Sequence, residues 1–378
     1  MANRIPAEIF PPGEFLQEEL EARGWTQGDL ADILGRDRNL VTGIVNAKRA
    51  ITPETARGFA DAFGTSAELW LNLEAAYQLS RVSDADDSVA RRAKVFAKAP
   101  VNQMIRRNWI EGSDNVAVLE ERLCEFLGID HIDEEPMFFA HAARKSTPYD
   151  AVSPSQLAWL VRARKLASTF TASPYDARRF SKTVSDLRRL LHSIEEVRHV
   201  PQVLADGGIR FVIVEPLQGS KIDAACFWLD DQSPVIAMSL RFDRIDNYWH
   251  TLMHELAHIN YEDGLINSNP ILDSDMYSDD ARVETPLFEQ AADAFAAETL
   301  VPQDSLNDFI GRVSPRYSTI RLEGFAELQR VHPAIVIGQL QHRNELSYSQ
   351  FRPLLERVRA TITNSALTDG WKHVLPAL

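Results

Sequence analysis

Two histidines and a glutamate in the segment HTLMHELAH have the residue types and the spacing of a hydrolytic metal site. His254 and His258 are four positions apart, so on a helix their imidazoles share one face and can converge on one Zn²⁺ at about 2.0–2.1 Å. Glu255 directly follows the first histidine and can reach a water molecule on that ion. Zinc lowers the pKa of such a water to about 7, and a nearby carboxylate can accept its proton during attack on a peptide carbonyl. The motif therefore predicts zinc-dependent peptide hydrolysis in which Glu255 takes the proton.

A third protein ligand is expected beside the histidines, because a hydrolytic zinc site uses three and leaves one position for water. The segment FEQAADAFAAETLVP supplies two candidates, Glu289 and Glu298. If this segment is a helix from Phe288, small residues that allow close helix packing surround Glu289, which favours it as the ligand. The alternative is a chance H-E-x-x-H on a solvated helix, since the chain has 10 histidines. The apolar residues that flank the motif favour a buried helix, and with it the metal site.

Short β-branched and aromatic runs precede the metal motif and indicate a small sheet. They begin after Gly207 and Gly208, and turn residues separate them. The predicted strands are Ile209–Glu215, Ala224–Asp230 and Pro234–Leu240. Helical periodicity dominates the rest of the chain. We therefore expect a mainly α protein with a small β-sheet, an α+β fold in which helices carry the metal ligands.

The length of 378 residues predicts more than one domain, because a single hydrophobic core stops growing at about 250–300 residues. A charged run, SRVSDADDSVARRAK, marks a boundary after an all-helical N-terminal part. We expect a DNA-binding domain at 1–80, a helical linker or middle region at 81–205, a metallopeptidase core at 206–310 and a C-terminal helical region at 311–378.

The N-terminal part has the layout of a helix-turn-helix, with helices near Thr26–Leu34 and Asp37–Val45 and a turn at Gly35. Thr26 and Asp37 suit helix N-caps. In such motifs the start of the second helix enters the major groove, while other residues contact the DNA backbone. The residues expected at base edges are Arg38, Asn39 and Thr42, and those expected near phosphates are Gln27 and Lys48. A helical protein-binding domain is the alternative, because the same geometry occurs where no DNA is bound.

Composition limits the class of protein. The net charge of −14 argues against a protein coated in nucleic acid, although it allows a local basic patch. Cys124 and Cys226 form neither a disulfide framework nor a C-x-x-C pair, which fits a reducing cytoplasm. The N-terminus lacks a signal-peptide pattern, and no run of about 18 apolar residues occurs. We therefore expect a soluble cytoplasmic protein without a membrane partner.

The metal motif and the later segment together resemble the ImmA/IrrE metallopeptidases, whose signature couples H-E-x-x-H to E-x-x-A-[DN]-x-F-A and a closing apolar residue and proline. Here the signature is HELAH, then EQAADAFA from Glu289, and then Val301-Pro302. The resemblance implies a compact, zincin-like domain that holds one Zn²⁺ per chain. Its implied ligands are His254, His258 and Glu289, and its implied general base is Glu255.

Three questions about the site stay open at this point. His250, where this family more often carries an apolar or aromatic residue, lies on the ligand face; it supports the metal ligands, faces the substrate, or is a packed or solvated histidine. The residue that steadies the oxyanion is not assigned; Tyr261, Tyr277 and His332 are candidates. The acidic stretch 273–284 is a lid over the metal or, as we favour, a solvated loop.

Residues 10–75 resemble the XRE-type domain of HigA antitoxins, especially in GEFLQEEL, TQGDLADILG and NAKRAITPETA. This resemblance implies a homodimer on a palindromic double-stranded DNA operator and, more loosely, a cognate toxin. The leading hypothesis is a DNA-binding transcriptional regulator whose zinc endopeptidase cleaves a repressor, another regulator or the chain itself. The second hypothesis is a HigA-like antitoxin and autorepressor without proteolysis, in which the zinc-site fold serves as a scaffold for toxin binding.

Overall fold

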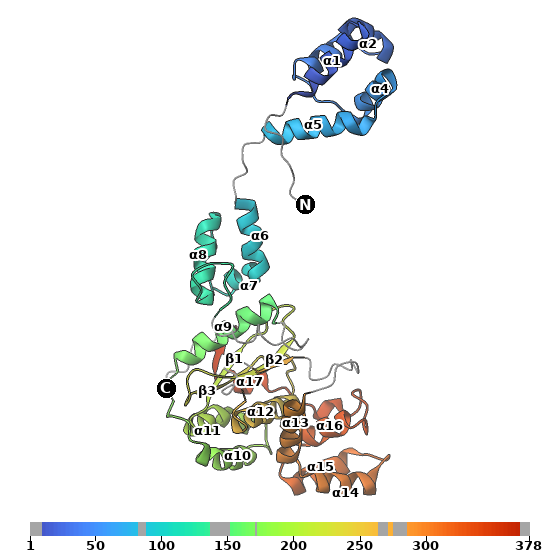
Figure 1. The fold of residues 1–378 in the computed structure, drawn as a ribbon. Coiled ribbons are helices and arrows are strands. Elements are labelled where there is room, and N and C mark those ends of the chain that lie inside the picture. Colours follow the sequence, from blue (N-terminus) through green and yellow to red (C-terminus); the bar gives the residue numbers. More distant parts are fainter. Residues whose placement is uncertain are drawn as a thin grey trace. The chain divides into compact units, whose positions relative to one another are not determined.

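The structure is a computed structural model of the chain, and it describes residues 10–81, 88–136, 152–170, 172–263, 271–274 and 286–370. The chain divides into two compact units, Met1–Ser88 and Val89–Leu378 (Figure 1). Each unit has its own hydrophobic core, so each is described by itself. Among the described residues, no helix has the length and apolar character needed to cross a membrane.

The first unit is all-helical. Its helices are α1 (Pro12–Arg23), α2 (Gln27–Leu34), α3 (Arg38–Val45), α4 (Pro53–Phe63) and α5 (Ala67–Arg81). They enclose a core of large apolar side chains that includes Leu16, Leu20, Leu30, Val41, Ile44, Phe59 and Trp70. This arrangement buries one face of α3 and leaves its other face to solvent, as a DNA-reading helix requires.

Local sequence signals fix the ends of α2 and α3. Thr26 forms a capping box with Asp29, in which each side chain accepts a hydrogen bond from the other residue's backbone N–H. Gly35 ends α2 with φ of 62°, a left-handed conformation that glycine adopts without strain. Asp37 caps α3 by accepting a hydrogen bond from the backbone N–H of Asn39. The predicted helix boundaries and both predicted N-caps are therefore confirmed.

The second unit is built on a five-stranded mixed sheet with the order β4-β2-β3-β1-β5. Its strands are β1 (Arg210–Val214), β2 (Ile222–Trp228), β3 (Pro234–Met238), β4 (Ile271–Ser274) and β5 (Leu367–Asp369). β1 pairs in parallel with β3 and β5, whereas β2 is antiparallel to β3 and β4. The three predicted strands are confirmed. β4 and β5 are additions that comprise only four and three residues, too few to show a periodic pattern.

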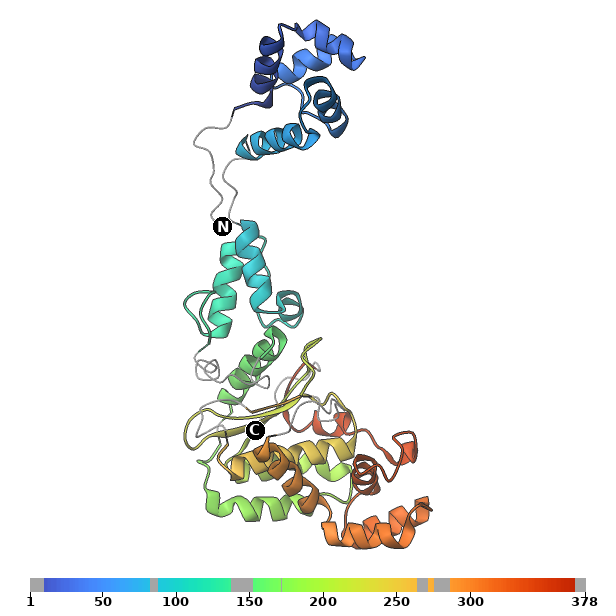
Figure 2. The ribbon, with the colours of Figure 1, turned by 45° about the vertical axis from the view of Figure 1, so that its right-hand side comes forward.

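Helices cover both faces of this sheet (Figures 1 and 2). On one face, α9 (Pro154–Ser168) lies against β1, and the hydrophobic cluster continues beyond it into α6 (Ser88–Lys98), α7 (Val101–Arg106) and α8 (Val116–Leu127). On the other face, α11 (Val200–Asp206) and α12 (Ile245–Asn260) lie against the strands. The core on that side also includes residues of α10 (Phe180–Arg188), α13 (Leu287–Leu300), α14 (Gln303–Val313), α15 (Thr319–Gln329), α16 (Pro333–His342) and α17 (Arg359–Ile362). Short 3₁₀ segments occur at Ala177–Arg179, Glu195–His199 and Arg352–Leu354. Because both faces are buried, β1 to β3 are mostly apolar rather than alternating, with the buried Asp223 of β2 as an exception.

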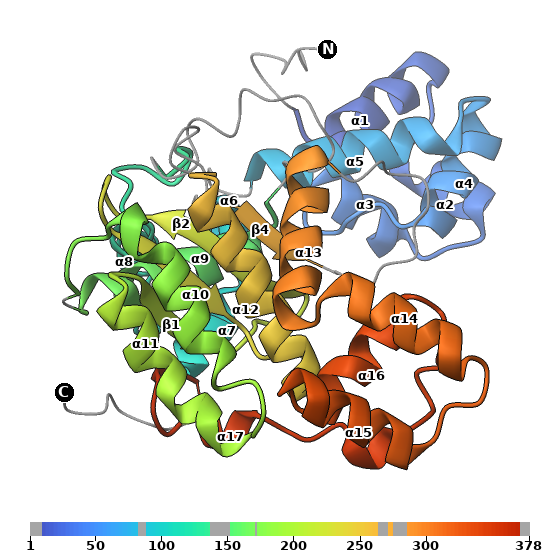
Figure 3. The same ribbon diagram turned by 90° about the horizontal axis from the view of Figure 1, so that it is seen from below.

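The segments outside 206–310 thus contribute directly to the second unit. Within 81–205, α9 covers one face of the sheet, with α6 to α8 packed in the same hydrophobic cluster, while α10 and α11 lie on the other side. Within 311–378, β5 forms an edge of the sheet, and α15 and α16 join the core beneath α12. Figure 3 shows α14, α15 and α16 grouped beside α12 and α13. The fold of the second unit therefore includes segments on both sides of residues 206–310.

A close contact between α16 and the start of α12 holds the helix of the metal motif in place. Gly338 of α16 lies so near Asp246 that a Cβ at this position would be 2.6 Å from Oδ2 of Asp246. Asp246 is buried and bonded by the guanidinium of Arg244, which also donates to Gln341. Moving Asp246 away from a Cβ at position 338 would disturb its ion pair with Arg244, so the contact favours glycine.

Gly338→Ala is therefore expected to destabilise the second unit by about 1–2 kcal/mol, because an overpacked contact outweighs the higher helix propensity of alanine. The matched control is Gly324→Ala in α15, where a Cβ would meet nothing within 4 Å. This control is expected to raise stability by about 0.5–1 kcal/mol. Calorimetric unfolding of both variants measures the difference, and equal effects would contradict the proposed contact.

Candidate metal centre

α12 is a nearly completely buried helix, which is unusual for a segment that carries two histidines and a glutamate. His254 is 2% exposed, and Glu255 and His258 are 0% exposed. Apolar side chains of the same helix, including Leu252, Leu256 and Ile259, pack into the core and fix its orientation. Buried ionisable groups are costly unless they are paired or bind a metal ion. The burial therefore excludes a merely solvated helix.

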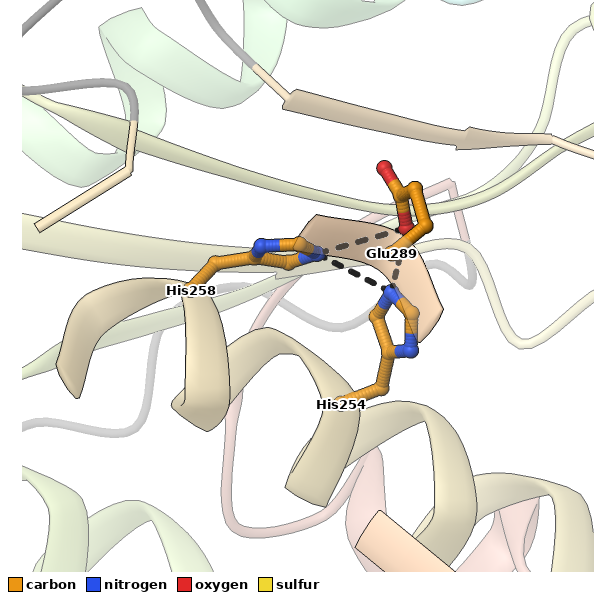
Figure 4. A group of neighbouring side chains, drawn as sticks. All are labelled: His254, His258 and Glu289. Carbon is orange, nitrogen blue, oxygen red and sulfur yellow. Dashed lines mark hydrogen bonds and ion pairs between the residues drawn. The ribbon is translucent and has the colours of Figure 1, made fainter. Parts of the chain in front are cut away.

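Three side chains from two helices meet at one point (Figure 4). Nε2 of His254 lies 3.0 Å from Nε2 of His258 and 3.0 Å from Oε2 of Glu289. Nε2 of His258 lies 3.5 Å from the same carboxylate oxygen. Separations of this size are those of donor atoms that each lie about 2 Å from a common ion. The two nitrogens and one oxygen match the donor set of a hydrolytic zinc site.

Two aspartates hold the far sides of the imidazole rings. Oδ1 of Asp293 is 2.9 Å from Nδ1 of His254, and Oδ2 of Asp263 is 3.0 Å from Nδ1 of His258. A carboxylate at Nδ1 favours a proton on that nitrogen, so the lone pair of each Nε2 points to the shared centre. Two facing lone pairs and a carboxylate oxygen repel one another, and a cation between them removes this repulsion.

Neither aspartate was identified from the sequence. Asp293 lies four positions after Glu289, so the two carboxylates share one face of α13. This four-residue spacing can be recognised in the sequence, and it indicates that Asp293 lies near the proposed ligand Glu289. Asp263 follows α12, and its backbone N–H donates to the carbonyl of His258, which turns the chain back toward the imidazole. That reversal is not visible as a sequence pattern.

The electrostatics keep Glu289 in the form that binds a cation. Burial raises the pKa of this carboxyl, but while the imidazoles of His254 and His258 carry a proton on Nε2, their hydrogen bonds and charges outweigh burial and lower the pKa to about 2; a bound cation would take the place of those protons. In contrast, burial raises the pKa of the Cys226 thiol well above its usual range, with further contributions from Glu255 and Asp263. Cys226 is therefore a neutral thiol near the site and not a thiolate ligand.

The remaining site candidates are spread over the second unit. Nε2 of His250 lies 3.6 Å from Oδ1 of Asp293, so His250 stands beside the aspartate that contacts His254. Glu298 is exposed and accepts a hydrogen bond from the backbone N–H of Gln303, away from the three donor atoms. Tyr261 ends α12 and is 42% exposed.

His332 and Tyr277 are the two other residues proposed from the sequence to stabilise the oxyanion. His332 caps α16 by accepting from the backbone N–H of Ala334, and its Nε2 contacts Glu356. Both ring nitrogens of His332 therefore make contacts that hold the start of α16. Tyr277 lies outside the described residues, as does the acidic stretch 273–284 except for the two backbone positions at its start.

The predicted DNA-contacting residues of the first unit lie on and around α3. Arg38, Asn39 and Lys48 are exposed, whereas Gln27 and Thr42 are half-buried. The hydroxyl of Thr42 donates a 2.8 Å hydrogen bond to Oε1 of Gln27, which joins the start of α2 to the middle of α3. The structure therefore brings all five residues to the α2–α3 region.

Each of the two units contains a segment that matches the model of a known protein family. A helix-turn-helix family model matches residues 16–70, and a peptidase family model described as an IrrE N-terminal-like domain matches residues 208–351. The second match contains α12, α13 and the three donor residues. It also contains β1 to β4, α14 and α15, so most of the observed metal-site fold belongs to this family's domain.

Individual relatives match the first unit. An uncharacterized HTH-type transcriptional regulator of Haemophilus influenzae is 44% identical over 75 residues, which cover 20% of this chain and 67% of that protein. Virulence-associated protein I of Dichelobacter nodosus is 35% identical over 88 residues, which cover 23% of this chain and 80% of that protein. A solved addiction module antidote protein of the HigA family from Coxiella burnetii is 42% identical, with coverage of 19% and 79% and a TM-score of 0.19. The chain therefore belongs, through its first unit, to the helix-turn-helix family of transcriptional regulators, and its second unit carries an IrrE N-terminal-like peptidase domain.

Proposed function

We propose that the second unit is a zinc endopeptidase and that the first unit directs it to double-stranded operator DNA. The observation that carries the enzymatic part is the convergence of two imidazole nitrogens and one carboxylate oxygen within 3.0–3.5 Å at a buried point. His254, His258 and Glu289 would hold one Zn²⁺, and the aspartates behind the imidazoles would keep both Nε2 atoms free of protons.

The reaction assigned to this site is hydrolysis of a peptide bond. A bound zinc ion supplies Lewis acidity, which polarises the substrate carbonyl and makes water a nucleophile at neutral pH. Glu255 lies on the same helix between the two histidines and is fully buried. Its carboxylate would accept the proton of the attacking water and pass it to the leaving amine.

The first unit supports a regulatory role for this activity. The exposed start of α3 carries Arg38 and Asn39, whose side chains suit guanine and adenine edges in the major groove. Lys48 and Gln27 would contact phosphates, and Thr42 would lie beside Gln27. A homodimer would place two α3 helices on a palindromic operator. We infer that the protein substrate is a repressor or another regulator bound near the same promoter, or the chain itself.

The experiment compares new N-termini in the proteome of cells that produce the wild-type chain with those of cells that lack it. Specific new N-termini are expected, and they should fail to form in extracts treated with 1,10-phenanthroline and return on addition of zinc. If no cleavage depends on both the chain and the metal, the peptidase proposal is wrong. The DNA-binding antitoxin and autorepressor would then account better for the first unit.

Asp293→Asn is expected to weaken zinc binding about 10–100-fold, because the neutral amide no longer fixes the tautomer of His254. Glu298→Gln is the matched control on the same helix, since Glu298 is exposed and its amide replacement can still accept from Gln303. Competition with a chromogenic chelator measures both affinities. Equal affinities of the two variants would show that Asp293 has no role in holding the metal.

A further inference from the structure

Two large apolar side chains stand exposed immediately before the carboxylate of the metal centre. Leu287 is 82% exposed and Phe288 is 43% exposed, and both belong to the first turn of α13, directly ahead of Glu289. Single exposed apolar residues are common on protein surfaces and need no explanation. Successive positions of a helix point about 100° apart, so of these two residues only Phe288 can lie on the side of α13 near the metal centre.

Phe288 is also in contact with the centre itself. Its ring lies edge-to-face against the imidazole of His258, with the ring centroids 6.1 Å apart. One residue of an extended chain spans about 3.3–3.6 Å. A peptide side chain that rests on Phe288 therefore belongs to a residue within about two positions of the bond that lies at the metal.

We propose that the exposed part of the Phe288 ring forms an apolar wall that selects substrates with a large aliphatic or aromatic side chain beside the scissile bond. This inference rests on the proposed peptidase function and names the substrate class of that site. The occupant of the wall is an extended polypeptide segment, because the metal centre adjoining Phe288 acts on a peptide carbonyl. Large apolar residues are mostly buried in folded proteins. The substrate segment is therefore a mobile or unfolded stretch that exposes such a residue.

Two small zinc-binding probes test the wall directly on the full-length, zinc-loaded protein. N-acetylglycine hydroxamate and N-acetylleucine hydroxamate share the metal-binding group and differ only in the side chain. Titration calorimetry is expected to show that the leucine probe binds about tenfold more tightly, since partial burial of a leucine side chain has an effect of this order.

Phe288→Ser is expected to reduce this affinity ratio to about 1–2. Because Phe288 contacts His258, zinc content is measured in parallel, and both probes are titrated at equal zinc occupancy. Leu287→Ser is the matched control, because Leu287 is also exposed but lies two helical positions, about 200°, around α13 from Glu289. The control should keep the tenfold ratio. A wild-type ratio near 1, as expected if another part of the chain covers the wall, overturns the inference.

A tenfold ratio that persists in Phe288→Ser overturns it as well. A different result would refute the proposed peptidase function itself. If zinc-loaded wild-type protein binds neither probe, the metal site does not act as assigned, and the wall proposal fails with it. If both probes bind equally, the metal site stands and only the wall is refuted.

Discussion

Replacement of Glu255 by glutamine is expected to reduce the rate of peptide hydrolysis about a thousandfold, because removal of a general base typically has an effect of 10²–10⁴-fold. Glutamine has the size of glutamate, so the buried helix should keep its packing. The three donor atoms come from other residues, and zinc content should therefore equal that of the wild type. The readout is the rate of appearance of the metal-dependent N-termini, followed in time with equal amounts of both proteins.

The combination of lost activity and retained metal is the informative result. Loss of zinc together with activity would show only that the site had collapsed, which a melting curve of the variant would reveal. Wild-type cleavage rates in Glu255→Gln would contradict the assignment of Glu255 as the base. Glu298→Gln is the matched control, because it removes a carboxylate from the same unit at an exposed position away from the donor atoms.

The second large effect concerns the first unit. Arg38→Ala combined with Asn39→Ala is expected to weaken operator binding about a hundredfold, since each well-placed base contact discriminates by about 1–3 kcal/mol. Both residues are exposed at the start of α3, and truncation leaves the helix core intact. The N-cap contact uses the backbone N–H of Asn39, so it survives the substitution. The operator is first selected from a random duplex pool with wild-type protein, and affinities are measured at fixed salt.

Arg81→Ala is the control for loss of positive charge, because Arg81 is exposed at the end of α5, outside the α2–α3 motif. It should retain nearly full affinity. If the double variant bound the selected operator as the wild type does, α3 would not read the bases. The first unit would then better fit the alternative of a helical protein-binding domain.

The sequence predicted the elements whose signals are local. The caps at Thr26 and Asp37 and the glycine at 35 depend on interactions within four residues, and each lies where the pattern places it. The four-residue spacing of His254 and His258 likewise depends only on helix geometry. These features required no knowledge of tertiary structure.

Features that arise from contacts between distant segments could not be read in the same way. β5 has three residues and joins the sheet only because β1 offers a free parallel edge. The position of Asp263 beside His258 follows from a chain reversal after α12. The sequence favoured Glu289 over Glu298 from its small neighbours, and the structure shows the physical basis. Ala292 and Ala296 are fully buried, so α13 can approach closely enough for Glu289 to reach the histidines.

The central claim is that this chain holds a zinc ion through His254, His258 and Glu289. Elemental analysis of the purified protein, beside the double variant His254→Ala, Glu289→Ala, tests it most directly. We expect about one zinc per chain in the wild type and its loss in the double variant, with the first unit still folded and able to bind its selected operator. Absence of zinc from the wild type, or equal zinc in both proteins, would show that these residues do not form a zinc site.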